Sequence, residues 1–214
     1  MSENLGDYRK SYEKNNFTVT DSAANPFTQF DHWFKEVEDS DGIEEVNAMT
    51  VATIGLDGFP KSRVVLLKNY DEQGFTFYTN YNSEKGKAIT ANPHICISFF
   101  WPNLERQVII KGKARKVSEK QSLSYFQSRP RGSQLGALVS PQSEIIPDRD
   151  FLENRLKSLE NDYEDQEIPK PEQWGGFLVV PHEFEFWQGR PNRLHDRIRY
   201  TGHKNQWKRD RLAP

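Results

Sequence analysis

The sequence predicts a mainly β fold with flanking helices, in which antiparallel strands form a barrel or a sandwich. Strand-like segments follow one another closely between residues 48 and 117, and tight turns join them. The dipeptide Asp57-Gly58 is a strong hairpin signal between the first two segments. Helices do not alternate regularly with these strands, which argues against a doubly wound sheet.

The individual elements follow from apolar spacing and from cap residues. Pro26 favours a first helical turn, and aromatic residues recur behind it at helical spacing. Ser83, Ser118 and Ser133 are N-cap candidates. The expected helices are residues 26–39, 83–91, 118–127, 134–139 and 147–163. The expected strands are residues 48–54, 62–69, 75–79, 95–101, 105–117, 176–180, 184–188 and 206–212.

Length and composition suit one domain, residues 26–214, behind a mobile N-terminal arm of residues 1–25. The single cysteine, Cys96, excludes an internal disulfide and favours a reducing compartment, so we expect a cytoplasmic protein. No apolar run approaches the roughly 18 residues of a membrane span. The net charge of −2 gives no global attraction to nucleic acid, so neither a membrane nor a nucleic-acid partner is expected.

The C-terminal end is basic, because residues 186–214 contain eight Lys or Arg residues and two Asp residues. The chain should be extended again after the turn at residues 189–192, and alternate side chains of a strand share a face. One face would then carry Arg193, His195, Arg197 and Arg199, and the other Leu194, Ile198 and Tyr200. Such a cation row is either an anion site or a solvated outer face, and the solvated face is the commoner outcome.

Several common sites are absent from the sequence. It has no G-x-G-x-x-G after a strand and no P-loop, and no G-x-S-x-G elbow is present. The five histidines form no H-E-x-x-H and have no cysteine cluster beside them, so no metal is expected.

Cations set among hydroxyls and aromatic residues remain as site candidates. Arg63 and Lys68 are the two ends of an apolar strand, and strand parity places them on opposite faces unless a bulge intervenes. A second set is Tyr78, Thr79, Lys85 and Lys87, and a third is Tyr125, Arg129 and Ser133. Each residue alone is more often a surface salt-bridge residue. Together, the sets suit the phosphate of an aromatic cofactor beside a second phosphorylated ligand.

Several motifs resemble the pyridoxine/pyridoxamine 5′-phosphate oxidase family. The most specific is Phe184-Glu185-Phe186-Trp187-Gln188, followed four residues later by Arg193-Leu194-His195-Asp196-Arg197. The other matching segments, in the same order as in the family, are residues 63–68, 105–108, 128–131, 174–176 and 211–214. The resemblance covers nearly the whole chain from about residue 26.

The resemblance implies a split β-barrel with FMN at the interface of a homodimer. It implies oxidation of pyridoxamine 5′-phosphate or pyridoxine 5′-phosphate to pyridoxal 5′-phosphate, with O₂ as acceptor and H₂O₂ as product. The FMN-binding residues that it implies are Arg63, Val64, Val65, Leu66, Leu67, Lys68, Tyr78, Thr79, Lys85, Gln107, Gln142, Ser143, Trp187 and Arg197. The substrate-binding residues that it implies are Arg9, Tyr12, Lys68, Tyr125, Arg129, Ser133, Arg193 and His195.

Two residues are candidates for catalysis. We expect Arg193 to pack over the pyridine ring and orient its C4′ carbon. We expect His195 to help keep the substrate amine or alcohol deprotonated, because a histidine titrates near neutral pH. Arg199 has no role in this scheme, and for it the solvated face remains the interpretation.

One departure from the family and two competing functions stay open. The family usually has a basic pair where this chain has Glu84-Lys85, so either Glu84 points away from the FMN phosphate or Lys87 substitutes. A flavin reductase with a nicotinamide donor is one alternative, although it needs no second phosphate pocket. A non-catalytic carrier of flavin or pyridoxal phosphate is the other.

Overall fold

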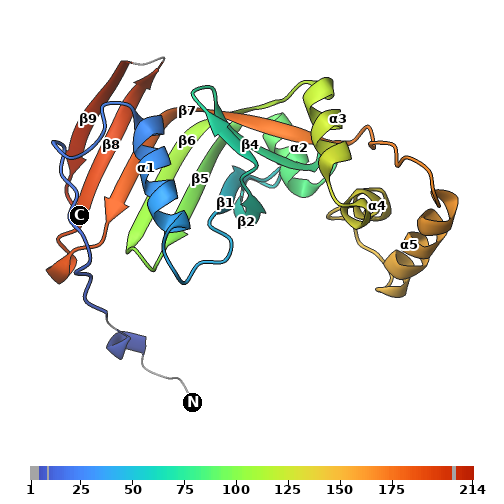
Figure 1. Ribbon diagram of the computed structural model, residues 1–214, viewed down its shortest axis with the longest axis horizontal. Coiled ribbons are helices and arrows are strands. Elements are labelled where there is room, and N and C mark those ends of the chain that lie inside the picture. Colours follow the sequence, from blue (N-terminus) through green and yellow to red (C-terminus); the bar gives the residue numbers. More distant parts are fainter. Residues whose placement is uncertain (1–4, 9, 204–205) are drawn as a thin grey trace. The chain divides into compact units, whose positions relative to one another are not determined.

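The computed structural model describes residues 5–8, 10–203 and 206–214, and Figure 1 shows the arrangement of their helices and strands. The strands are β1 (Ala48–Ile54), β2 (Pro60–Leu66), β3 (Asn69–Asp71), β4 (Gly74–Asn80), β5 (His94–Trp101), β6 (Arg106–Lys116), β7 (Trp174–Gln188), β8 (Asp196–His203) and β9 (Gln206–Leu212). The helices are α1 (Pro26–Glu38), α2 (Glu84–Ala91), α3 (Glu119–Ser128), α4 (Arg131–Val139) and α5 (Asp150–Asp162). Two short 3₁₀ turns are η1 (Leu5–Asp7) and η2 (Pro191–Arg193).

The strands form one hydrogen-bonded sheet in the order β2-β1-β5-β6-β7-β4-β3, and β8 pairs with both β7 and β9. The pairs β3–β4, β4–β7, β7–β8 and β8–β9 are antiparallel. The predicted mainly β fold with flanking helices is therefore confirmed. None of the helices in the described ranges is long and apolar enough to cross a membrane.

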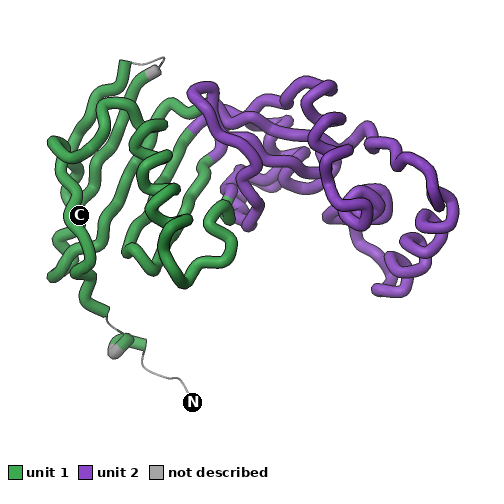
Figure 2. Tube along the Cα trace, viewed as in Figure 1, with its two compact units in different colours: residues 1–50, 96–111, 181–214 green, residues 51–95, 112–180 purple. Residues whose placement is uncertain are grey.

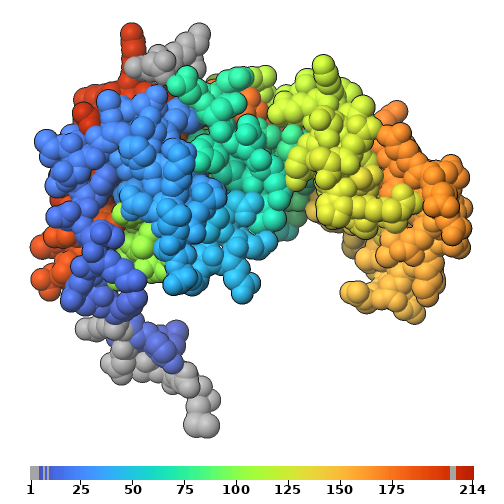
Figure 3. Space-filling view, viewed as in Figure 1, coloured from blue at the N-terminus to red at the C-terminus, as the bar shows by residue number. Residues whose placement is uncertain are grey.

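The chain divides into two compact units, coloured separately in Figure 2. Unit 1 contains residues 1–50, 96–111 and 181–214. Its core forms where α1 packs on aromatic residues of the strands: the Phe30 and Phe99 ring centroids are 5.1 Å apart, and those of Trp33 and Phe186 are 5.2 Å apart. The N-terminal segment also packs here, and Figure 3 shows it in blue against the red C-terminal strands.

Unit 2 contains residues 51–95 and 112–180. Helices α3 and α4 and the start of β7 bury a cluster formed by Phe126, Leu135, Ile168 and Trp174. The exposed helix α5 buries no residue fully, and it contributes partly buried leucines to this cluster. Helix α2 is capped as predicted, because the Ser83 hydroxyl accepts a hydrogen bond from the Gly86 N–H.

The two strands predicted at residues 176–180 and 184–188 are one continuous strand, β7. Proline normally ends a central strand because it has no N–H to donate. The register of β7 with β4 ends at Val179, and its register with β8 begins at Glu183. Pro181 therefore lies between these two ladders, where neither loses a hydrogen bond.

The extended segment predicted from Arg193 begins three residues later, at Asp196. Asn192 and Arg193 have φ angles of 56° and 62°, so the chain makes a left-handed turn there instead of a strand. The predicted face is accordingly wrong for Arg193 and for Leu194, which is 67% exposed. The predicted inner face is right for Ile198 and Tyr200, which are fully buried, while Arg197 and Arg199 lie on the opposite face.

Other boundaries differ from prediction by one to three residues, and two of them concern residues proposed for the site. Strand β2 ends at Leu66, because the chain then turns to pair with β4, and the Lys68 N–H donates to the Thr76 carbonyl at 2.9 Å. Helix α4 begins at Arg131 with Pro130 in the cap position, so Ser133 lies within its first turn and does not cap it. The short strand β3 was not predicted.

Candidate functional site

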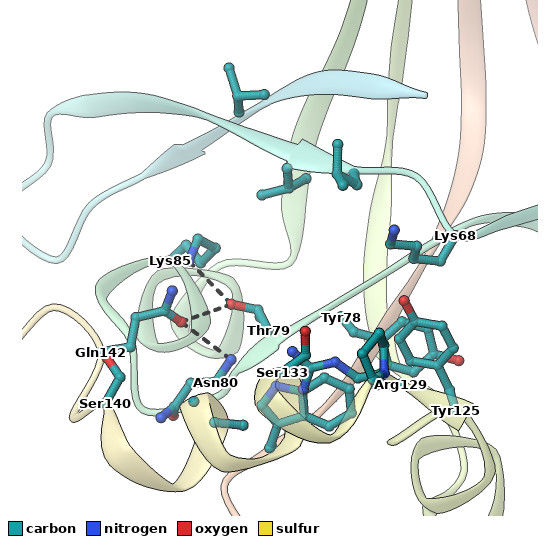
Figure 4. A pocket seen from close by; sticks show the side chains of 17 residues that line it. Lys68, Tyr78, Thr79, Asn80, Lys85, Tyr125, Arg129, Ser133, Ser140 and Gln142 are labelled. Carbon is teal, nitrogen blue, oxygen red and sulfur yellow. Dashed lines mark hydrogen bonds between the residues drawn. The ribbon is translucent and has the colours of Figure 1, made fainter. Parts of the chain in front are cut away.

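A cavity of about 590 Å³ lies in unit 2, lined by residues from β2, β4, α2, α3, α4 and the loop after α4 (Figure 4). The predicted site residues that line it are Val64, Val65, Leu66, Lys68, Tyr78, Thr79, Lys85, Tyr125, Arg129, Ser133 and Gln142. These residues are separated by up to about 80 positions in the sequence, so the fold brings together members of all three predicted sets.

One end of the cavity presents a buried cation. Lys85 is 9% exposed, and its Nζ donates to the Thr79 hydroxyl at 3.1 Å. The Thr79 hydroxyl donates in turn to the Gln142 side-chain oxygen at 3.2 Å. Burial lowers the pKa of Lys85, Arg63 lowers it further, and Glu84 opposes both effects. A buried ammonium whose partner is a neutral hydroxyl is a favourable place for an anion.

The other end is an aromatic wall with an arginine on it. The rings of Tyr78 and Tyr125 stack at 3.9 Å, and Trp174 continues the stack 5.5 Å from Tyr78. The Arg129 guanidinium lies 4.7 Å from the centre of the Trp174 ring. Its Nη1 atom is buried and has no hydrogen-bond partner among the described residues. Burial lowers the pKa of Arg129, with Tyr125 opposing, as expected for a cation without a nearby anion.

The β2 segment supplies an apolar wall and one further cation. Val64, Val65 and Leu66 line the cavity, and Lys68 follows them at its exposed edge. Leu67 points into the core instead and is 4% exposed. The Arg63 guanidinium does not line the cavity, because it donates to the carbonyls of residues 51 and 61 and, at 2.7 Å, to the Thr53 hydroxyl.

Glu84 and Lys87 both lie outside the lining of the main cavity. The Glu84 carboxylate pairs with the Lys61 ammonium at 2.5 Å. It borders a smaller hollow of about 320 Å³, which Lys87 and Ser143 also line. Ser143, with a φ of 76°, lines only this second hollow of the two, whereas its neighbour Gln142 lines both.

The predicted ring-contacting residues lie in unit 1. The Trp187 and His195 ring centroids are 4.6 Å apart, and the Tyr12 ring lies 5.8 Å from Trp187 and 6.0 Å from His195. The Arg190 N–H donates to His195 Nδ1 at 3.1 Å. Burial lowers the pKa of His195, Arg193 lowers it further, and Asp196 opposes them. Arg9 lies outside the described residues.

The remaining unit 1 candidates are held by structural partners. Arg197 donates to Glu185 at 2.7 Å, and this hydrogen bond raises its pKa. Gln107 donates to the Ser98 hydroxyl at 3.2 Å. Arg199 lies 3.4 Å from Asp210, and its Nε atom is buried without a hydrogen-bond partner among the described residues. Arg193 is exposed at its left-handed turn.

Several supporting residues were missed in the sequence. Lys61 neutralises Glu84, and the buried Asp196 pairs with Arg190 and Arg211. The pairs of Lys61 with Glu84 and of Asp196 with Arg211 join different elements, and the pair of Asp196 with Arg190 spans the turn between β7 and β8, so no local pattern signals them. Trp174 belonged to a recognised motif, but its place behind Arg129 depends on the packing of α3 against β7.

Two family models match the chain. Residues 36–161 match the model described as pyridoxamine 5′-phosphate oxidase, and residues 174–214 match the pyridoxine 5′-phosphate oxidase C-terminal dimerisation region. Relatives named pyridoxine/pyridoxamine 5′-phosphate oxidase include one from Flavobacterium johnsoniae, 64% identical over 98% of both chains. Another, from Christiangramia forsetii, is 54% identical over the full length of both.

Solved structures share the fold. PhzG from Burkholderia lata, crystallised with tetrahydrophenazine-1-carboxylic acid, has a TM-score of 0.87 and 27% identity, covering 95% of this chain and all of its own. A pyridoxamine 5′-phosphate oxidase-related, FMN-binding protein from Nostoc punctiforme has a TM-score of 0.69 and 16% identity, covering 87% of this chain and 96% of its own. The likeness identifies the sheet as the split barrel that the motifs implied.

Proposed function

The chain belongs to the pyridoxamine 5′-phosphate oxidase family, and from this premise we propose that it oxidises pyridoxamine 5′-phosphate and pyridoxine 5′-phosphate to pyridoxal 5′-phosphate. O₂ is the electron acceptor and H₂O₂ the product, and the reaction serves the synthesis and salvage of vitamin B6. The protein is an FMN-dependent oxidoreductase and a homodimer with its active site at the subunit interface. The observation that carries the proposal is one cavity with two cations, Lys85 and Arg129, at separate places in its lining.

The residues of the cavity fit FMN. Lys85 is a buried cation, and no carboxylate of the described residues lies within ion-pair distance of it. Lys85, Thr79 and Gln142 would hold the FMN phosphate, while Val64, Val65 and Leu66 offer an apolar surface to the ring system. When bound, FMN would supply the redox chemistry of the reaction, which is acceptance of a hydride equivalent and electron transfer to O₂. Arg63, Leu67, Lys68, Tyr78, Gln107, Ser143, Trp187 and Arg197 complete the proposed FMN set.

The second cation set would hold the substrate phosphate. Arg129 has a buried donor atom without a partner among the described residues, and a phosphate oxygen would satisfy it. Tyr125, Ser133 and Lys68 line the same cavity and add hydroxyl and ammonium donors. A guanidinium backed by an aromatic ring keeps its planar donor edge in place, which favours phosphate recognition.

His195 and Arg193 are the proposed catalytic residues. Arg193 would orient the C4′ carbon of the substrate, and His195 would act on its amine or alcohol. The Arg190 N–H donates to His195 Nδ1, so the neutral imidazole carries its proton on Nε2. Nε2 can then donate a hydrogen bond. It could act as a base only in the other tautomer, in which the proton is on Nδ1. We propose the donor role as the resting state and the base role as the alternative.

Two substitutions separate these roles. His195→Gln keeps an amide donor near the place of Nε2, and His195→Asn keeps only an acceptor near Nδ1. The donor role predicts that the Gln variant retains much more kcat than the Asn variant. Equal loss in both, together with loss of the acidic limb of the pH profile, would favour the base role. Arg193→Leu with unaltered kcat/KM would remove Arg193 from the mechanism.

Two further proposals concern the whole chain. We propose that residues 1–25 are a mobile arm on a single domain of residues 26–214, which limited proteolysis with and without substrate tests. We propose a cytoplasmic location, supported by the single, partly buried Cys96 that leaves no internal disulfide. Cell fractionation tests it.

The oxidase function has a direct spectroscopic test. The purified protein is expected to be yellow, and its flavin absorbance is expected to bleach when pyridoxamine 5′-phosphate is added without oxygen. Readmitted O₂ should restore the colour and release H₂O₂. Bleaching only with a nicotinamide would favour a flavin reductase, and no bleaching with either would favour a carrier.

A further inference from the structure

Glu105 is a buried carboxylate in an unfavourable backbone conformation. It lies between β5 and β6, is 2% exposed and has a φ of 58°. A residue other than glycine adopts this region at a cost, and a buried carboxylate also loses its hydration. Such a residue persists where surrounding contacts stabilise it, so its partners indicate its role.

The side chain of Glu105 faces the N-terminal segment. One carboxylate oxygen accepts the Lys14 backbone N–H at 3.1 Å, and the other lies 3.8 Å from the Lys10 ammonium. The Lys14 ammonium donates to the neighbouring Asn103 carbonyl. Among the described residues, the hydrogen-bond and ion-pair partners of this carboxylate therefore all belong to residues 10–14.

The backbone of Glu105 faces the hairpin after β7. Its carbonyl accepts the Gly189 N–H at 2.7 Å and the Gln188 amide at 3.3 Å. Gly189 in turn lies against Tyr12, because a Cβ at position 189 would come within 2.8 Å of the Tyr12 ring. Glu105 thus binds the segment that carries Tyr12 through its carboxylate, and it binds Gly189, on which the Tyr12 ring packs, through its carbonyl.

We propose that Glu105 is a positioning residue for substrate binding. Its carboxylate anchors residues 10–14, and this anchor holds Tyr12 beside Trp187 and His195, the residues proposed to contact the substrate ring. The inference rests on the proposed oxidase function for its kinetic consequence. The anchoring itself can be measured without any reaction.

Glu105→Gly is the main test, because glycine adopts a φ of 58° without strain and keeps the carbonyl that holds Gly189. The KM for pyridoxamine 5′-phosphate is expected to rise about tenfold, since a buried, charged hydrogen-bond acceptor is lost. The kcat, the FMN affinity and the Tm are expected to stay near those of the parent protein. Trypsin should cleave after Lys10 and Lys14 faster, as mass spectrometry of the holoenzyme would detect.

Two further variants separate positioning from a merely structural role. Glu105→Gln keeps an acceptor oxygen for the Lys14 N–H. Its KM for pyridoxamine 5′-phosphate should therefore lie closer to the parent value than that of Glu105→Gly. Tyr12→Ala should raise the KM, and its combination with Glu105→Gly should add little, because both changes remove the same contact. The matched control is Asp165→Gly, which relieves a similar φ of 57° at an exposed side chain and should change neither KM nor cleavage.

Different outcomes would contradict the positioning role of Glu105 and the proposed oxidase function. An unchanged KM and an unchanged cleavage rate in Glu105→Gly would overturn the inference, as would fully additive effects of the Tyr12 and Glu105 changes. A fall in Tm and FMN affinity that accompanies the KM rise would assign Glu105 a structural role only. If the parent protein does not oxidise pyridoxamine 5′-phosphate, the proposed function fails, while the cleavage assay still decides whether Glu105 anchors the segment.

Discussion

Cations in two regions of the molecule have opposite surroundings. On β8 in unit 1, Arg197 and Arg199 pair with Glu185 and Asp210 on the neighbouring strands. In the cavity of unit 2, no carboxylate of the described residues lies within ion-pair distance of Lys85 or Arg129. The difference teaches that a row of cations in the sequence does not by itself indicate how much of their charge carboxylates of the same chain already neutralise.

The physical reason is the cost of desolvation. A paired cation has already exchanged water for a carboxylate, so a ligand gains little from it. A buried cation with only a hydroxyl or no partner keeps most of its capacity to bind an anion. The lowered pKa values of Lys85 and Arg129 have this cause, since burial is the main effect on both.

Arg129→Met should have the largest effect, because it removes the proposed phosphate donor and leaves the phosphate partly unpaired. The kcat/KM for pyridoxamine 5′-phosphate is expected to fall about 1,000-fold, or about 4 kcal/mol, mainly through KM. Steady-state kinetics measure it. The control is Arg131→Met, which removes a nearby exposed arginine that bonds only to loop carbonyls among the described residues. Equal effects of the two changes would remove Arg129 from the phosphate site.

Asp196→Asn tests the paired region of unit 1. The Asp196 carboxylate is 5% exposed, pairs with Arg190 and Arg211, and accepts the Phe17 N–H at 3.0 Å. Loss of its charge leaves two arginines without their carboxylate, so the free energy of unfolding should fall by about 3 kcal/mol. Urea unfolding of the apoprotein measures it. Asp210→Asn, at a more exposed pair, should cost much less, and an equal cost would show that burial of Asp196 is unimportant.

Lys85→Met should weaken FMN binding by about 30-fold, or about 2 kcal/mol, because it removes the buried ammonium proposed for the phosphate. Fluorescence titration of the apoprotein with FMN measures it. The same change should raise the Tm of the apoprotein, because it removes a buried charge without a carboxylate partner. A variant with parental FMN affinity would contradict the assignment.

The pH dependence of the apoprotein gives a second test of Lys85. Burial holds the pKa of Lys85 below its ordinary value of 10.5, so the unfolded chain binds more protons than the folded one at alkaline pH. Stability from this group therefore rises as the pH increases from the folded pKa towards 10.5. Thermal unfolding at increasing alkaline pH below 10.5 should therefore show the parent protein gaining stability relative to Lys85→Met.

Arg199→Gln should have the smallest effect. Its ion pair with Asp210 is partly exposed, so the free energy of unfolding should fall by less than about 1 kcal/mol. FMN affinity and KM should not change. A tenfold rise in either constant would mean that Arg199 belongs to the site.

The sequence predicted most elements because local patterns determine them. Aromatic spacing after Pro26 gave α1, the Ser83 cap gave the start of α2, and β1 and β9 have the predicted bounds. The turn at residues 189–192 was predicted, but its extension to Arg193 was missed because a left-handed arginine has no local signature, and this error also misplaced Leu194. The two strands predicted at residues 176–180 and 184–188 are one strand, β7, whose partner changes from β4 to β8 along its length, and no local pattern signals such a change.

The site was predicted only as separate residue sets. Local reasoning found Tyr125 and Arg129 four positions apart, but the bond between Thr79 and Gln142 joins residues 63 positions apart. The carboxylates that neutralise Arg197 and Arg199 lie on other strands, so the sequence could not distinguish these arginines from those of the cavity. The resemblance to the family, rather than the spacing of residues, predicted that these distant residues belong to one site.

The most direct test of the account compares pyridoxamine 5′-phosphate with pyridoxamine, which lacks the phosphate, in the parent protein and in Arg129→Met. The unpaired cations of the cavity predict that the parent protein favours the phosphorylated compound by about 1,000-fold in kcat/KM, and that most of this preference disappears in the variant. Equal kcat/KM values for the two compounds in the parent protein would contradict the central claim that these cations bind the substrate phosphate.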